Sequence, residues 1–179
     1  FGCSISLSDD GSTIAIGSEE YQNDDRETPG RVRVFEWNGG SWIQKGRNIT
    51  GIVYGEKWWE SHFGVSVSLS GDGSTLVAGA TNYYKDSSEL IGGVQVFRFE
   101  NDWEQLGRTI YGHNHKYNFG NAVSISDENL IIAVGEMREM RDDPGTVRVY
   151  EYGECQPCPK GTYQDQTSQT CKSCSVGRY

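Results

Sequence analysis

FGVSVSLSGDGSTLVAGA, residues 63–80, is the segment of this chain with the clearest structural pattern. Its first half alternates apolar and polar residues with period two, which is typical of a half-buried strand. Asp72-Gly73 follows, a dipeptide that supplies the positive φ required by a tight hairpin turn. Leu76-Val77-Ala78 is then a short continuous apolar run, which suits a strand buried on both faces. The stretch therefore predicts a β-hairpin that ends at Gly79.

The same stretch occurs three times, so the chain contains a repeat. Phe1, Phe63 and Phe119 each begin a copy, at spacings of 62 and 56 residues. The hairpin of every copy closes on a glycine sixteen residues later, at Gly17, Gly79 and Gly135. These spacings exceed those of solenoid units and are close to the length of a propeller blade. Because one unit cannot bury its own hydrophobic face, neighbouring copies must stack.

Further strands complete each copy. A third strand is predicted in all three copies, at Val32–Phe35, Val94–Phe97 and Val147–Tyr150. A fourth strand, led by tryptophan, is predicted only in the first two copies, at residues 42–44 and 103–105. Four antiparallel strands per copy are typical of a β-propeller blade. No stretch shows convincing helical periodicity, so we expect an all-β fold.

The repeat resembles a known family. Phe-Gly-x-Ser-Val-Ser-Leu-Ser, Asp-Gly, a glycine-terminated strand and Gly-x-Val-x-Val-Phe are similar to the FG-GAP repeats of the integrin α-subunit propeller. They are closer still to the shorter FG-GAP-like variant of secreted bacterial and microbial-eukaryote proteins. The resemblance covers residues 1 to about 152. It implies a partial propeller in residues 1–153, with further blades upstream and the missing strand of the third copy lent by the N-terminus of the intact protein.

Integrin-type copies bind calcium through an Asp-x-Asp-x-Asp-Gly loop, and the hairpin turns of this chain depart from that pattern. The corresponding segments are only Ser8–Gly11, Ser70–Gly73 and Ser126–Asn129. Two or three residues cannot supply the roughly six to eight oxygen ligands that calcium takes. We therefore expect no calcium at these turns and no other cofactor.

Composition restricts the partners. The formal net charge is −9 at pH 7, and both nucleic acid and anionic membrane surfaces repel an acidic protein. No run of about eighteen apolar residues is present, so no membrane-spanning segment is predicted. No signal peptide is visible either. Because Phe1 stands at the start of a repeat, we expect an interior fragment or a processed product.

The four cysteines of residues 154–179 form a second pattern. Cys155-x2-Cys158 and Cys171-x2-Cys174 enclose a twelve-residue spacer, which nearly fits a four-cysteine zinc ribbon. Against zinc, Cys158-Pro-Lys-Gly-Thr-Tyr recurs sixteen residues later as Cys174-Ser-Val-Gly-Arg-Tyr. This tail resembles the cysteine-rich ectodomain modules of the ephrin-receptor, TNF-receptor and EGF-like class, which are extracellular disulfide ladders. Of the three pairings that four cysteines allow, that resemblance favours Cys155–Cys171 with Cys158–Cys174.

Three other positions are candidate sites. Cys3, the odd cysteine, is interpreted either as a buried or half-buried strand residue or as the partner of a cysteine outside this chain. Asn48-Ile49-Thr50 is an N-glycosylation sequon near the end of a fourth strand, at the outer edge of a blade. Trp58 and Trp59 are adjacent and cannot both face inward on a strand, so one is expected to be exposed between blades, where the favoured interpretation is packing against the next blade and the other is an anchor for a protein or sugar.

Several polar groups are assigned no site. The acidic loops Glu19–Asp25 and Arg141–Asp143 are interpreted as solvated loops, with a weak cation or partner contact as the alternative. His113 and His115 share a face only in an extended segment and have no third ligand nearby. Gly-x-Ser-x-Gly, His-Glu-x-x-His and phosphate-cradling glycine loops are all absent from the sequence. We therefore expect no enzymatic activity.

These patterns predict a secreted or cell-surface module with a structural or adhesive role. The resemblance implies a part of a large surface, cell-wall or flagellar-hair assembly, whose partners are other chains, further domains of the same chain, or glycans. One alternative is the ectodomain of a membrane receptor. Another is a propeller enzyme whose active site lies in upstream blades. We also expect the isolated chain to self-associate, because its sheet edges lack partners.

Overall fold

A computed structural model of the protein describes residues 1–23, 27–51, 61–83, 91–113, 117–127, 130–138, 145–151, 162–164 and 171–173. The regular structure of these residues is β-strand, arranged in four antiparallel sheets. This confirms the all-β prediction. No helix capable of crossing a membrane occurs among the residues so described.

Sheet 1 is formed by the first copy of the repeat. Its strands follow the chain in the order β1-β2-β3, and the two short strands β4 and β5 both pair with β3. The predicted fourth strand is therefore split, because the chain turns at Gly46 with a φ of 73°. The strand bounds are β1 (Ile5–Leu7), β2 (Thr13–Ser18), β3 (Arg31–Trp37), β4 (Trp42–Gln44) and β5 (Ile49–Thr50).

Sheet 2 repeats this arrangement in the second copy. Strands β6, β7 and β8 are consecutive neighbours, and β9 and β10 both pair with β8. Gly107, with a φ of 68°, divides the outer strand where Gly46 divides it in sheet 1. The bounds are β6 (Phe63–Leu69), β7 (Thr75–Ala80), β8 (Gly93–Phe99), β9 (Trp103–Gln105) and β10 (Ile110–Tyr111).

Sheet 3 has three strands, and the tail contributes a separate pair. Sheet 3 consists of β11 (Tyr117–Ile125), β12 (Ile131–Arg138) and β13 (Thr146–Glu151), in that order. In the tail, β14 (Thr162–Gln164) pairs with β15 (Cys171–Ser173). The strands of the three copies thus agree with those predicted from the sequence, except that the fourth strand of the first two copies is split in two.

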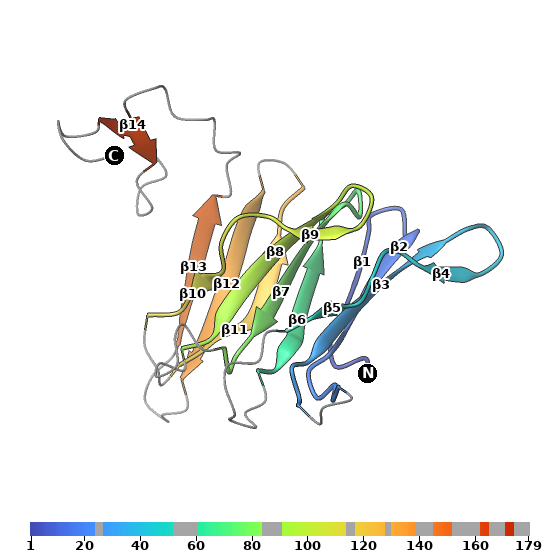
Figure 1. The fold of residues 1–179 in the computed structure, drawn as a ribbon, viewed down its shortest axis with the longest axis horizontal. Coiled ribbons are helices and arrows are strands. Elements are labelled where there is room, and N and C mark those ends of the chain that lie inside the picture. Colours follow the sequence, from blue (N-terminus) through green and yellow to red (C-terminus); the bar gives the residue numbers. More distant parts are fainter. Residues whose placement is uncertain are drawn as a thin grey trace.

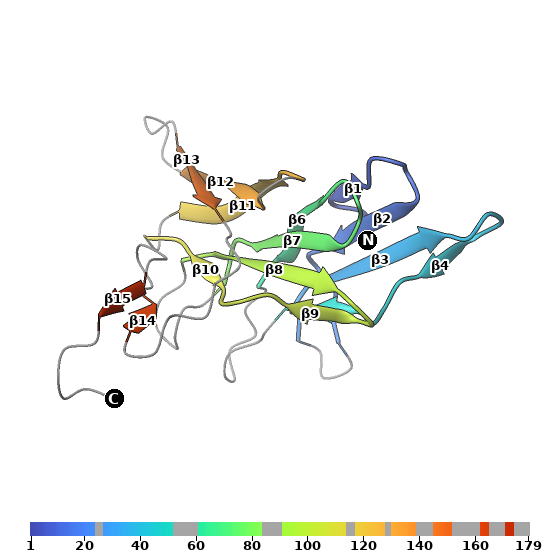
Figure 2. The ribbon, with the colours of Figure 1, turned by 90° about the horizontal axis from the view of Figure 1, so that it is seen from above.

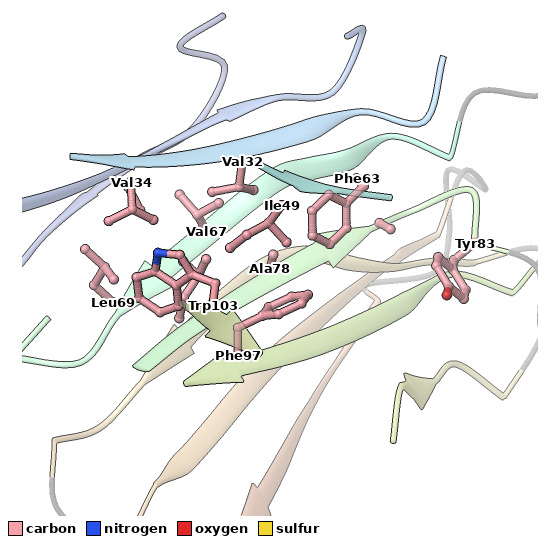
Figure 3. Packing of buried hydrophobic residues seen from close by; sticks show 13 residues of the cluster. Val32, Val34, Ile49, Phe63, Val67, Leu69, Ala78, Tyr83, Phe97 and Trp103 are labelled. Carbon is pink, nitrogen blue, oxygen red and sulfur yellow. The ribbon is translucent and has the colours of Figure 1, made fainter. Parts of the chain in front are cut away.

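Sheets 1, 2 and 3 lie side by side as an open stack, with sheet 2 in the middle (Figures 1 and 2). Figure 3 shows the core between sheets 1 and 2, where Val32 and Val34 of β3 point toward Trp103 and its neighbours on sheet 2. A second core joins sheets 2 and 3 and contains Val77, Val94, Val96, Phe119, Ile132 and Val134. Every residue of β7 is buried, because sheet 2 is covered on both sides.

Each sheet has two different faces. The side of sheet 2 that packs on sheet 1 carries Phe63, Val67 and Leu69, and we call this side, and the corresponding side of the other sheets, the front face. We call back face the opposite side, which in sheet 2 carries Val94 and Val96 and packs on sheet 3. The front face of sheet 1 and the back face of sheet 3 are covered by no other described sheet. The described sheets therefore form a stack and not a closed ring.

Candidate interaction surface

The acidic side chains of the first hairpin turn are held by the turn itself. Asp10 Oδ1 accepts hydrogen bonds from the Ser12 amide at 2.9 Å and from the Ser8 hydroxyl at 2.7 Å. These donors, the Ser12 amide most strongly, lower the pKa of Asp10 to about 2. A carboxylate stabilised in this way serves to close the turn.

The second hairpin repeats this geometry. Asp72 accepts hydrogen bonds from the Ser70 hydroxyl at 2.6 Å and from the Ser74 amide and hydroxyl at 2.9 and 2.7 Å. The Ser70 hydroxyl has the largest effect in lowering the pKa of Asp72, while burial opposes that shift. Within the described ranges, no group of three or more histidine, cysteine or acidic residues is placed to hold a metal ion.

A row of serines joins the inner edges of the three sheets, and we call it the serine row. Ser4 Oγ donates to the Gly64 carbonyl, and Ser66 Oγ donates to the Gly120 carbonyl, both at 2.7 Å. Two residues further along each strand, the serine accepts a hydrogen bond instead. These contacts are Leu69 N–H to Ser6 Oγ at 2.9 Å and Ile125 N–H to Ser68 Oγ at 3.1 Å.

Close backbone approach accompanies the serine row. A Cβ atom at Gly17 would collide with the Gly64 carbonyl oxygen, and one at Gly79 would collide with the Gly120 carbonyl oxygen. The hairpin tips also touch, since the Asp9 amide donates to the Gly71 carbonyl at 2.9 Å and the Gly71 amide donates to Asp127 Oδ1. Sheets 1–2 and 2–3 are therefore joined by the same kind of interface.

The outer edges of sheets 1 and 2 are also joined. The indole N–H of Trp103 donates to the Lys45 carbonyl at 2.8 Å, and the Arg47 amide donates to Asp102 Oδ1 at 2.7 Å. The Arg47 amide is the main cause of the lowered pKa of Asp102. Sequence reasoning identified Trp103 only as a strand marker. Its position at the start of a strand, opposite a glycine-interrupted segment, is the signal that was missed.

Most of the large exposed apolar side chains lie on the two uncovered faces. On the front face of sheet 1 they are Phe1, Ile5, Leu7, Trp37 and Trp42, which we call the front patch; the rings of Trp37 and Trp42 lie 5.6 Å apart. On the back face of sheet 3 they include Val147 and Val149 of β13, which we call the back patch; Ile131 and Met137 of β12 are also exposed and share this face by strand alternation. Exposed apolar patches of this kind mark interaction sites in soluble proteins.

Two predicted site residues lie within the described part of sheet 1. Asn48 is exposed, as is Thr50, and Asn48 Oδ1 accepts a hydrogen bond from Gln44 Nε2 at 3.1 Å. Cys3 has a free thiol that lies 3.4 Å from the Gly64 carbonyl oxygen. Cys3 is exposed and precedes β1, so the expectation of a buried or half-buried strand position was wrong.

The remaining predicted positions are only partly described. In the tail, Cys171 begins β15 and pairs with Gln164. His113, which follows β10, is exposed. No disulfide bond is present among the described residues. The other predicted positions lie outside the described residues: Trp58, Trp59, Cys155, Cys158, Cys174, His115, Asp24, Asp25 and the loop 141–143.

The chain matches no known protein family, and no curated protein matches it. The resemblance to FG-GAP-like repeats and to cysteine-rich ectodomain modules therefore stays a prediction.

Proposed function

We propose that this chain is a non-enzymatic, extracellular structural or adhesion module, made of FG-GAP-like propeller blades followed by a disulfide-rich tail. The repeated interface carries the proposal. The serines that recur in the copies bond to the neighbouring sheet, and Asp10 and Asp72 bond within their turns. The recurring polar groups thus serve to join and shape sheets, and a stack of sheets presents an extended surface to partners.

The glycosylation sequon supports an extracellular location. Asn48 and Thr50 are both exposed at the outer edge of sheet 1. Within the part of the chain that the structure describes, the Asn48 amide makes one hydrogen bond, through its oxygen, so the nitrogen that would carry a glycan is not engaged. Expression in a secreting eukaryotic host should therefore add a glycan at Asn48. Mass spectrometry before and after glycosidase treatment detects it, and the Thr50→Ala variant, which keeps Asn48, should lack it.

The tail hairpin supports the proposed disulfides. Ser173 pairs with Thr162, which follows Cys158 by four residues, and Cys174 directly follows Ser173. This register brings the segments that follow Cys158 and precede Cys174 together, in keeping with the Cys158–Cys174 bond that the resemblance implies. Cys155–Cys171 is then the remaining pair. Four of the five cysteines would be oxidised and Cys3 would be free.

Mass spectrometry of the unreduced protein tests this proposal. Alkylation in denaturant should label one cysteine, and zinc should be absent. Trypsin cleaves after Lys160 and Lys172, so crossed pairs hold three tryptic peptides together. Cys155–Cys158 and Cys171–Cys174 bonds would instead release the peptide that contains Cys155 and Cys158 and leave only the other two joined. Stoichiometric zinc with four free tail thiols would contradict the extracellular proposal.

A further inference from the structure

We infer that this chain associates head to tail with a second copy of itself, so that the back face of sheet 3 of one copy covers the front face of sheet 1 of the next. The inference deepens the proposed structural role and rests on it. It does not depend on the chemistry of the tail, so the two proposals can fail separately.

The front patch consists of positions that are covered in the middle sheet. Each residue of the front patch has a counterpart at the same repeat position in sheet 2, where sheet 1 covers it. The exposed fractions are 59% for Ile5 and 8% for Val67, 54% for Leu7 and 6% for Leu69, and 44% for Trp42 and 1% for Trp103. What covers these positions in sheet 2 is the back face of another sheet.

The back patch shows the converse. Val147 and Val149 of β13 are 72% and 66% exposed. Their counterparts in β3 and β8 are fully buried by the next sheet: Val32, Val34, Val94 and Val96. The two patches are therefore the two halves of an interface that this chain already forms twice.

The serine row has matching open groups at its two ends. Ser124 occupies the position of Ser6 and Ser68, and it has no such amide donor within the described residues. At the other end of the row, the Ser8 amide donates to the Thr13 carbonyl of the neighbouring strand. Because successive amides of an antiparallel strand point to opposite sides, the amide of Leu7 points away from β2, to the free edge of the sheet. In the proposed contact, Ser124 Oγ of one copy accepts the Leu7 N–H of the next.

The glycines give the same match. The carbonyl groups of Gly64 and Gly120 fill the space beside Gly17 and Gly79, where a Cβ atom would stand. At Gly135 this space is open, since the nearest atom to an added Cβ is Ala122 Cβ at 3.3 Å. Gly2 has a φ of 92°, close to the values of 86° and 89° at Gly64 and Gly120. Its carbonyl would fill the space at Gly135 of a second copy.

Two features weaken the contact between copies relative to that between sheets. Ala122 replaces the serine found at Ser4 and Ser66, so the Gly2 carbonyl would lack a hydroxyl donor. Each chain also carries a formal charge of −9, and the repulsion between two chains opposes association until salt screens it. We therefore expect reversible association that strengthens with salt. An interface between two different faces closes a ring or extends into a filament, depending on the rotation per sheet.

Sedimentation velocity on the full 179-residue chain tests the inference. The unmodified chain should form dimers or larger species at micromolar concentration. A front variant, Ile5→Asn with Leu7→Asn, and a back variant, Val147→Asn with Val149→Asn, should each associate at least about tenfold more weakly, since each loses apolar burial. Asparagine is used because it leaves the net charge unchanged.

Mixing the two variants gives the decisive result. The front variant keeps its back face and the back variant keeps its front face, so an equimolar mixture should form a dimer and nothing larger. Ile43→Asn is the matched control, since Ile43 is 52% exposed and its counterpart Glu104 stays exposed in the covered sheet; this variant should associate normally.

Other outcomes would overturn the inference. They are a monomeric unmodified chain, a mixture that stays monomeric, or loss of association in only one of the two variants, which would indicate a contact between like faces. Thermal melting monitors whether each variant folds. If the back variant does not fold, Gly135→Ala replaces it, because its added methyl group occupies the space assigned to the Gly2 carbonyl.

Discussion

The third strands of sheets 2 and 3 share a motif and differ in surroundings. Val94 and Val96 of β8 are fully buried, whereas Val147 and Val149 of β13 are 72% and 66% exposed. Both strands pair with their central neighbour in the same register. The difference therefore comes from the next sheet, which covers β8 and is absent from the described surroundings of β13. Burial in this molecule is a property of the stack, and each sheet alone has two apolar faces to cover.

The phenylalanine that begins each repeat gives the largest predicted change in stability. Phe63 is fully buried between sheets 1 and 2, and its ring meets that of Phe97 edge-on at 6.1 Å, whereas Phe1 is 65% exposed. Phe63→Ala should lower the free energy of unfolding by about 3–5 kcal/mol through lost contacts and the cavity left behind. Phe1→Ala should cost less than about 1 kcal/mol, mainly a cation–π contact with Arg33. Urea titrations at low protein concentration measure both changes in the free energy of unfolding. Equal changes would show that Phe1 is covered within a single chain.

The close-approach glycines give the next effect. A methyl group at Gly79 would collide with the backbone of Gly120, so Gly79→Ala should push sheets 2 and 3 apart at a cost of about 1–3 kcal/mol. Gly135→Ala meets only Ala122 Cβ at 3.3 Å and should cost less than about 1 kcal/mol. Thermal unfolding compares the two variants. If they are equally destabilised, the collision between sheets is not what requires a glycine here.

The serine row provides a smaller effect. Ser66 Oγ donates to the Gly120 carbonyl in a buried setting. Ser66→Ala should cost about 1 kcal/mol, because that hydrogen bond is lost and the carbonyl is left without a donor. Ala122→Ser restores the serine in the copy that lacks it and should change the stability of a single chain by less than about 0.5 kcal/mol, since its side chain is exposed. Denaturant midpoints resolve this difference, and an unchanged midpoint for Ser66→Ala would remove the serine row from the stabilising contacts.

The strands could be predicted from the sequence because their signals are local. The alternation in residues 63–69 and the turn at Asp72-Gly73 lie within one hairpin, and each indicates its own structure without reference to the rest of the chain. Period-two alternation also indicates which residues share a face. It does not indicate what covers that face, and therefore the exposure of Val147 could not be predicted from a motif that is buried in two other copies.

The contacts between sheets could not be predicted for the same reason. Ser66 and Gly120 are 54 residues apart, and Arg47 and Asp102 are 55 apart. Ser66 lies in an alternating strand, where a serine is expected on a solvent-exposed face, and only the neighbouring sheet converts it into a buried donor. The split of the outer strand at Gly46 was also missed, although a glycine inside a strand pattern is a known signal of an interruption.

The smallest effect concerns pH and compares the first two hairpin turns. The pKa of Asp10 is lowered from its ordinary value of 3.8 to about 2, first by the Ser12 amide and then by the Ser8 hydroxyl. Because the folded value lies below the unfolded one, the ionised carboxylate stabilises the fold above about pH 4, and this contribution is lost as the pH falls toward 2. The pKa of Asp72 is lowered in the same direction, with the Ser70 hydroxyl as the largest cause.

An NMR titration of the aspartate side chains measures these values directly. Ser8→Ala removes one of the donors to Asp10 and should raise the pKa of Asp10 from about 2 toward 3.8, while leaving that of Asp72 unchanged. Ser70→Ala should raise the pKa of Asp72 and leave that of Asp10 unchanged. It should remove more of the shift, because the Ser70 hydroxyl is the main cause of the lowered pKa of Asp72. Since the two turns differ in which donor dominates, the relative size of the two shifts tests the geometry more closely than either shift alone. An Asp10 carboxyl that titrates near 3.8 in the unmodified protein would show that the turn is not closed by these hydrogen bonds.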